Sequence, residues 1–225
     1  KSALFKDLPR CPIAAILLGQ ILTQESKELP STLPELYSQY VEVSVGRWES
    51  LKGLQSQKEF KALDAILQNI SVFMMKAGAD RLNKEEAKSF YTDYFSNRNL
   101  GIDADDFFKR STNRCSIICL IEGNSLFCFK HRSFIEFYYA KKMMNSGELT
   151  IDCDAFHPYW SHSFYFYIGL LEEPDKTLNE VINLEPSNDI ERYSKYVNLS
   201  DYLLAGYTSE YKVIENGVKA ATCEA

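Results

Sequence analysis

The segment from Phe127 to Ala140 holds the chain's most informative combination of charged, polar and aromatic side chains. It reads Phe-Cys-Phe-Lys-His-Arg-Ser-Phe-Ile-Glu-Phe-Tyr-Tyr-Ala and passes from a β-prone run into a helical pattern. His131 and Ser133 therefore stand where a helix is expected to begin. The first amides of a helix lack partners within it and carry a partial positive charge, so such a position favours an anion. His131 is accordingly either a phosphate contact or only the cap of a helix with an aromatic core behind it.

Other residue types with catalytic or metal-binding chemistry are not arranged as sites. His157 and His162 flank Trp160 without further ligands nearby, so we expect core or surface histidines. The motifs GxxxxGK(S/T), GxGxxG, HExxH and GxSxG are all absent. The cysteines form no CxxC pair, and we interpret them as reduced thiols: Cys11, Cys115, Cys119, Cys128, Cys153 and Cys223. The chain by itself is therefore not expected to be an enzyme or to bind a metal.

Charge and hydropathy argue against two classes of partner. The formal net charge is -6 over 225 residues, which disfavours nucleic acid because that affinity rests on basic side chains. The longest apolar run, Ile13 to Leu18, is too short to cross a bilayer and lacks the flanks of a signal peptide. We therefore expect a cytoplasmic protein without a membrane partner. The chain begins with Lys1 rather than Met and enters a helical pattern almost at once, so we expect a fragment or a processed or truncated form of a protein.

Two proline-bearing segments introduce helical patterns within residues 1–56, which we interpret as a helical domain. Pro12 suits the first turn of a helix, where its missing amide proton has no partner to lose. In the second segment Thr32 is a cap candidate and Pro34 lies just inside a helix that should end near Trp48. The face of the first helix is expected to be apolar at helical spacing: Ile13, Ile16, Leu17, Leu18, Ile21 and Leu22.

Residues 57–146 carry the only strong hairpin signal in the chain. Two β-prone runs, Cys115–Ile121 and Ser125–Lys130, are separated by the turn residues Glu122-Gly123-Asn124. Asn83 and Asp103 are candidate caps of two of the surrounding helices. Those helices are expected over residues 57–76, 83–95 and 102–110, and from Ser133 onward. Three helices, a hairpin and another helix predict a winged-helix-like domain.

Residues 147–225 show short, consecutive helical patterns separated by brief turns. This succession is typical of paired-helix stacking, although no clean repeat is present. The expected helices cover residues 159–171, 176–183, 189–196, 199–205 and 210–221. The predicted fold class is mainly α: a helical bundle plus a winged-helix domain with one β-hairpin, followed by short stacked helices.

Three segments, in matching order and spacing, resemble motifs of the NACHT-type signal-transduction ATPases of the STAND class. The residues from Phe129 to Ala140 resemble the winged-helix signature F-x-H-x-S/T-F-x-E-F-x-A-A, with Tyr139 in place of the common small residue. Leu8 to Ala14 resembles the proline-bearing segment that opens the family's first helical domain. The pattern that follows there, LP…ELY…RW, is matched by Leu29-Pro30, Glu35-Leu36-Tyr37 and Arg47-Trp48. Residues after about 155 are similar to the linker that precedes a sensor array.

The resemblance implies a role for two residues and a cofactor for the complete protein. His131 would reach the β-phosphate of ADP and hold a closed, inactive state, and Pro12 would contact the bound nucleotide. The phosphate loop, the magnesium-binding acidic motif and the arginine sensor are absent. These 225 residues are therefore not expected to bind ADP or ATP tightly. The implied partners are the nucleotide-binding core of the same protein and, on activation, further copies of it, in bacterial defence signalling.

Two other functions stay open on the sequence. A stand-alone winged-helix module that binds DNA would need a basic recognition helix. The segment Ser133–Met144 carries Lys141 and Lys142 but is mainly aromatic, which suits packing better. A non-catalytic helical scaffold for protein interactions would leave His131 facing solvent without a role.

Overall fold

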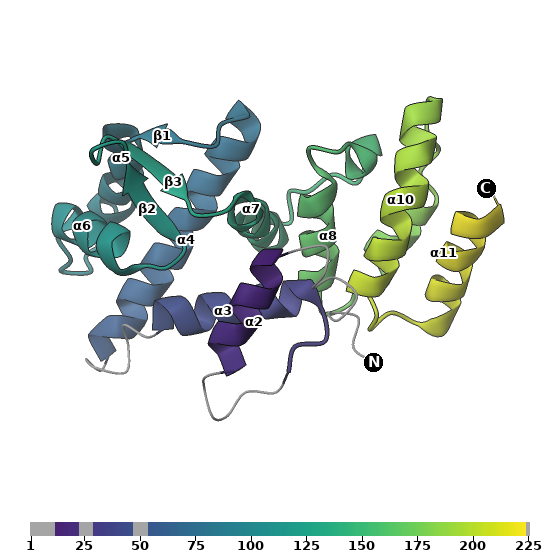
Figure 1. Ribbon diagram of the computed structural model, residues 1–225, viewed down its shortest axis with the longest axis horizontal. Coiled ribbons are helices and arrows are strands. Elements are labelled where there is room, and N and C mark those ends of the chain that lie inside the picture. Colours follow the sequence, from purple (N-terminus) through teal and green to yellow (C-terminus); the bar gives the residue numbers. More distant parts are fainter. Residues whose placement is uncertain (1–11, 23–28, 47–53, 224–225) are drawn as a thin grey trace. The chain divides into compact units, whose positions relative to one another are not determined.

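Helices dominate the computed structural model, which describes residues 12–22, 29–46 and 54–223. A small three-stranded antiparallel sheet accompanies them, so the predicted mainly-α fold class is confirmed (Figure 1). The chain packs into two compact units, one of residues 39–142 and one that joins residues 1–38 with 143–225. The predicted domain boundaries after residues 56 and 146 stay predictions.

The unit of residues 39–142 contains three helices, a hairpin and a further helix. The strand order is β1-β3-β2, and both strand pairs are antiparallel. This is the predicted winged-helix arrangement with one strand more than expected. After the end of α3 (Leu33–Gly46), its elements are α4 (Leu54–Ala77), β1 (Leu82–Asn83), α5 (Lys84–Ser96), α6 (Ala104–Arg114), β2 (Ile118–Ile121), β3 (Leu126–Phe129) and α7 (Arg132–Ser146). The last residues of α7, from Met143 on, belong to the other unit.

The hairpin turn falls on the predicted residues. Glu122, Gly123 and Asn124 all have positive φ, at 51°, 68° and 69°. Glycine and asparagine accept this left-handed region readily, which is why the sequence signalled a turn here. The extra strand β1 has only two residues, and Leu82 lies opposite Phe127 of β3. A strand this short carries no alternation, so the sequence pattern could not predict it.

Two of the predicted helix caps behave differently. Asp103 is confirmed, since its carboxylate accepts a hydrogen bond from the amide of Asp106 at 2.8 Å. Asn83 occupies the position before α5, but its side chain makes no capping hydrogen bond. Its backbone is extended and pairs with Leu126, so sheet pairing replaces the expected cap.

Aromatic side chains fill the interior of this unit. The rings of Tyr91 and Phe108 meet edge to face with centroids 5.0 Å apart, and Phe107 lies 5.4 Å from Phe95. Phe127 of β3 lies 6.5 Å from Phe108 and joins the sheet to this cluster. Such pairs contribute beyond the area they bury, roughly 1 kcal/mol each. The sheet is therefore held against α5 and α6 by aromatic packing.

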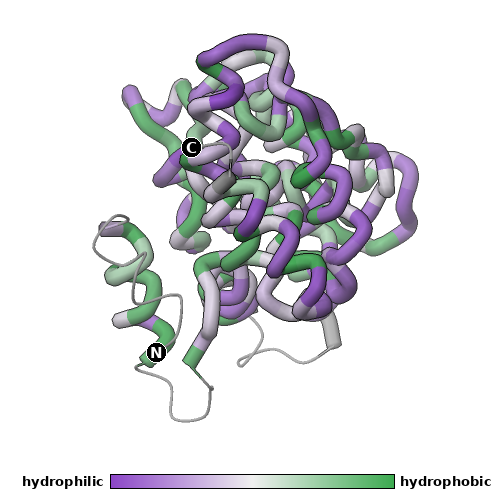
Figure 2. The backbone as a smooth tube through the Cα atoms, turned by 90° about the vertical axis from the view of Figure 1, so that its right-hand side faces the viewer, coloured by the Kyte–Doolittle hydropathy of each residue, from purple (hydrophilic) through white to green (hydrophobic). Residues whose placement is uncertain are grey.

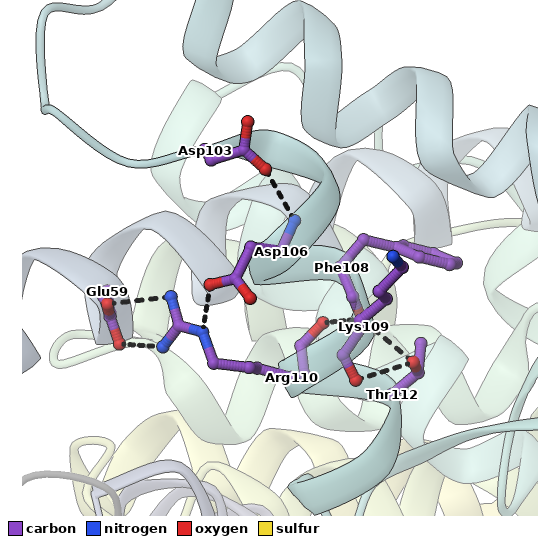
Figure 3. A network of polar contacts seen from close by, with 8 residues as sticks. Glu59, Asp103, Asp106, Phe108, Lys109, Arg110 and Thr112 are labelled. Carbon is purple, nitrogen blue, oxygen red and sulfur yellow. Dashed lines mark hydrogen bonds and ion pairs between the residues drawn. The ribbon is translucent and has the colours of Figure 1, made fainter.

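An arginine on α6 fastens this helix to α4 (Figure 3). The guanidinium of Arg110 donates to both carboxylate oxygens of Glu59, at 3.0 and 3.1 Å. Its Nε donates to Asp106, one helical turn earlier, at 2.8 Å. The hydrogen bonds to Glu59 are the main reason why the pKa of Arg110 is raised. A two-pronged pair of this kind fixes geometry as well as contributing energy.

The second unit consists of helices that precede and follow the winged-helix region. Its described elements are α2 (Pro12–Leu22), the first part of α3 (Leu33–Gly46), the 3-10 helix η1 (Cys153–Phe156), α8 (Ser161–Leu170), α9 (Asp175–Ile182), α10 (Asp189–Ala205) and α11 (Tyr211–Cys223). Helix α10 packs against both α8 and α11, as Figure 1 shows. Gly217 of α11 faces Leu203 of α10, and a Cβ at this glycine would lie 2.5 Å from Leu203 Cδ2, so the leucine side chain would have to shift. The predicted short stacked helices are therefore present.

Two details of this unit correct the sequence prediction. Residues 189–205 form one helix instead of two, because Asn198 is accommodated by donating its side-chain amide to Ser194 O at 2.8 Å. In α2, which Figure 2 colours mainly as hydrophobic, the buried face is narrower than predicted. Ile16 and Leu22 are 60% and 57% exposed.

The start of α3 follows the predicted capping. Thr32 Oγ1 accepts a hydrogen bond from Glu35 N at 3.4 Å, and Pro34 is the second helical residue. Glu35 in turn accepts from Ser31 N at 2.6 Å. The predicted end near Trp48 lies outside the described residues. No helix in the part of the chain that the structure describes combines the length and apolar character needed to cross a membrane.

Candidate functional site

The candidate site is the junction between β3 and α7. Strand β3 ends at Phe129, and the backbone amide of Lys130 still bonds to Ile117 O at 2.8 Å, which extends the hairpin pairing by one step. Helix α7 begins at Arg132. His131 therefore stands directly before the first helical residue, as the sequence predicted, and its side chain is exposed.

His131 caps the helix through its own ring and its own carbonyl. The amide of Ser133 donates to His131 Nδ1 at 3.2 Å, and the amide of Phe134 donates to His131 O at 3.1 Å. The hydroxyl oxygen of Ser133 lies 2.6 Å from the same ring nitrogen. Because a backbone amide can only donate, Nδ1 acts as an acceptor, and the neutral imidazole then carries its proton on Nε2. His131 thus caps α7 through Nδ1 and its carbonyl, and its ring is exposed.

A charged cluster stabilises the first turn of α7. Arg132 Nε donates to Glu136 at 2.9 Å, and Arg132 Nη1 donates to Asp80 at 3.2 Å. The side chain of Glu136 is only 8% exposed, so this pair is more than a surface contact. With two carboxylates beside it, Arg132 adds little net charge to the site. Lys130 is exposed and has no ion-pair partner among the described residues, so it adds a positive charge beside His131.

Sequence reasoning missed both partners of Arg132. Glu136 follows Arg132 by four positions, a helical spacing that signals an ion pair and could have been used. Asp80 is separated from Arg132 by 52 residues and precedes β1, so no local pattern points to it. The second predicted nucleotide contact, Pro12, is the exposed first residue of α2. Pro12 belongs to the unit that contains residues 1–38, whereas His131 belongs to the unit of residues 39–142.

Within the part of the chain that the structure describes, the remaining histidines and cysteines do not gather into a metal site. His157 Nδ1 accepts from Tyr159 N at 3.1 Å, and His162 lies beside the ring of Phe166. No group of three metal-binding side chains occurs within the described residues. Burial raises the pKa of Cys115, and it raises that of Cys128 to about 11. Free thiols are described for Cys115, Cys119, Cys128 and Cys153, whereas Cys11 and Cys223 lie outside the described side chains.

An anion at this junction would meet three groups that can attract it. They are the positive end of α7, the exposed ring of His131 and the exposed ammonium of Lys130. The Ser133 hydroxyl that lies beside the His131 ring is buried, and no pair of acids is described at this junction. In comparison with known proteins, no family model and no curated protein matches the chain.

Proposed function

We propose that this chain is the regulatory helical and winged-helix arm of a NACHT-like STAND ATPase. In this proposal the nucleotide is bound mainly by a core that lies outside these 225 residues. The arm senses whether ADP or ATP is present and controls a switch between a closed state and a signalling oligomer. The observation that carries the proposal is the exposed His131 at the start of α7, where its Nδ1 accepts the amide of Ser133 and the positive end of the helix attracts an anion.

The switch follows from one hydrogen bond that exists in only one nucleotide state. A donor bound to a charged phosphate contributes about 2 kcal/mol, which changes an equilibrium roughly thirtyfold. With ADP bound, the contact from His131 would favour the closed state. Exchange for ATP would remove that preference, because a ligand shifts an equilibrium only through differential contacts with the two states. The positive end of α7 adds to the attraction for phosphate.

The competing interpretation is that His131 is only a cap. Its bonds to Ser133 N and Phe134 N would then be its whole contribution. The substitution His131→Asn separates the two roles, because asparagine is among the best capping residues but offers no imidazole N–H at the same place. His131→Ala removes both roles and is expected to cost about 1 kcal/mol of stability in addition.

The charge of the winged helix does not favour the alternative DNA-binding function. The helix that precedes the hairpin is α6, and it contains two aspartates beside its three basic residues. One of those basic residues, Arg110, is already paired with Glu59 and Asp106. A DNA-binding helix needs basic side chains for the phosphates. Strong, salt-sensitive binding of duplex DNA by the 225-residue chain would reverse this conclusion.

The proposal is tested first on the complete coding sequence and then on the complete protein. A GxxxxGK(S/T) motif must occur in the complete protein, since no phosphate-binding loop lies in this chain. In the purified protein, His131→Asn should raise basal oligomerisation in the presence of ADP, measured by light scattering after size-exclusion chromatography. A complete protein without a phosphate loop, or an ADP-bound His131→Asn variant that stays as monomeric as the unaltered protein, would contradict the proposal.

A further inference from the structure

A cavity of about 390 Å3 lies among α9, α10 and α11, wholly within the second unit. Its size falls in the range of small-molecule sites. The wall combines amide, charged and apolar side chains. The lining includes Asn179, Ile182, Asn183, Leu184, Lys195 and Asn216. This mixture suits a compact polar ligand with a short apolar part.

The key group in the wall is Lys195, which is only 5% exposed. Its ammonium donates to Leu184 O at 2.8 Å and has no carboxylate within ion-pair distance among the described residues. An ammonium has three donors, and burial of an unpaired charge is costly. The cavity therefore contains a buried cation with donors to spare, in a chain whose net charge is -6.

The neighbouring side chains define which anion fits. Lys219 forms an exposed ion pair with Glu215 at 2.6 Å, which offsets its positive charge in part. Glu185 contributes a negative charge to the same wall. The amide side chains of Asn179, Asn183 and Asn216 make no hydrogen bonds to other described residues and can serve ligand hydroxyl or amide groups. Glu185 would repel any anion in a wall that it shares with the two lysines, but it would repel a doubly charged phosphate more than a singly charged ligand.

We propose that this cavity binds a small polar monocarboxylate, with the ligand carboxylate on Lys195 and its polar groups on the asparagine amides. Ile182 and Leu184 would cover the short apolar part. The charge-assisted bond to Lys195 gives selectivity for a carboxylate over a neutral amide of the same shape. This inference does not rest on the proposed nucleotide switch, because it uses a different unit and different residues.

The test is a binding titration of the whole 225-residue chain, followed by two-dimensional amide NMR. L-lactate is the probe, L-lactamide is the neutral analogue of matched shape, and inorganic phosphate is the doubly charged anion. Lactate should shift the side-chain amide signals of Asn183 and Asn216 and bind roughly tenfold or more tightly than lactamide, the difference expected of a charge-assisted bond. Equal affinity for lactate and lactamide, no shifts at these amides, or tighter binding of phosphate would overturn the proposal.

Variants of exposed residues keep the test independent of folding. Asn216→Asp places a carboxylate at the rim and should weaken lactate binding about fivefold or more through like-charge repulsion. Glu185→Gln should strengthen binding, because it removes a negative charge. Lys212→Met, on the exposed side of α11 and outside the cavity wall, should leave it unchanged. If neither Asn216→Asp nor Glu185→Gln changes the affinity for lactate, the proposal is also overturned. This outcome decides the matter even if a Lys195→Met variant fails to fold.

Discussion

At the scale of single residues, some buried or capping polar groups have hydrogen-bond partners, and others have none among the described residues. His131 uses its ring nitrogen and its carbonyl to cap α7, which the sequence located by the change from strand to helix. The bond between Arg132 and Asp80 could not be predicted, because the two lie far apart along the chain. The hydroxyl of Tyr138 is buried and has no hydrogen-bond partner among the described residues, which the sequence could not predict either. Local patterns reveal caps, whereas the partners of buried polar groups depend on tertiary packing.

Tyr138 allows the energetic consequence to be measured. Its side chain is fully buried, its hydroxyl has no hydrogen-bond partner among the described residues, and burial raises its pKa. Tyr138→Phe should therefore leave the free energy of unfolding unchanged or raise it by up to about 1 kcal/mol. Tyr91→Phe is the matched control, because Tyr91 accepts a hydrogen bond from Ser111 at 3.1 Å and should lose about 1 kcal/mol. If urea unfolding shows that Tyr138→Phe lowers the free energy of unfolding more than Tyr91→Phe does, the prediction is refuted.

The thiol of Cys128 offers a second measurement at this scale. Burial and then the neighbouring Cys119, with its sulfur 3.5 Å away, raise the pKa of Cys128 to about 11. The reactive thiolate is therefore scarce at neutral pH and grows with pH until that value is reached. The rate of alkylation by iodoacetamide near pH 8 is measured by mass spectrometry. It should be lower at Cys128 than at a free cysteine by a factor of roughly ten or more. A rate that levels off below about pH 9 would show that the pKa is not raised.

At the scale of secondary-structure elements, the sequence predicted those with a long pattern or a strong turn. Helices α4 to α7 and the hairpin lie where periodicity and turn residues place them. The two-residue strand β1 carries too little pattern to be recognised. The predicted break between residues 196 and 199 does not exist, since α10 continues through Asn198. Element existence was thus readable from local signals, whereas sheet pairing and helix continuity depended on contacts with the rest of the unit.

The link between α4 and α6 gives a prediction about these elements. Arg110 is 30% exposed and Glu59 is 12% exposed, so their two-pronged pair is partly shielded from water. Arg110→Ala should lower the free energy of unfolding by roughly 1–2 kcal/mol, more than an exposed pair would. Lys109→Ala, an exposed neighbour on the same helix, should change it by less than about 0.5 kcal/mol.

Thermal and urea unfolding of both variants decide this prediction. The double variant Glu59→Gln with Arg110→Ala should lose less than the sum of the two single losses, because both substitutions remove the same interaction. Strict additivity would mean that the pair in Figure 3 contributes no coupling energy. Equal effects of Arg110→Ala and Lys109→Ala would have the same meaning.

At the scale of the whole molecule, the grouping of helices from both ends of the chain was beyond local sequence signals. Tyr37 of α3 packs on Phe166 of α8 with ring centroids 4.9 Å apart. Tyr207 donates to Glu35 at 2.7 Å across 172 residues of sequence. These contacts join residues 1–38 to the C-terminal helices in one unit. The chain thus presents a winged helix within one unit and a stack of helices in the other, which is the architecture that the proposed sensing arm requires.

The most direct test of the proposed function is the rate at which the complete protein releases ADP. Fluorescent ADP is loaded, excess unlabelled ADP is added, and the decay is compared for the unaltered protein, His131→Asn and His157→Asn. His157 is the matched control, because it too accepts a backbone amide on Nδ1 but follows η1 instead of preceding α7. The account predicts roughly thirtyfold faster release from His131→Asn, the loss of a bond of about 2 kcal/mol, and an unchanged rate for His157→Asn. Equal release rates for all three proteins would contradict it and leave His131 as a helix cap alone.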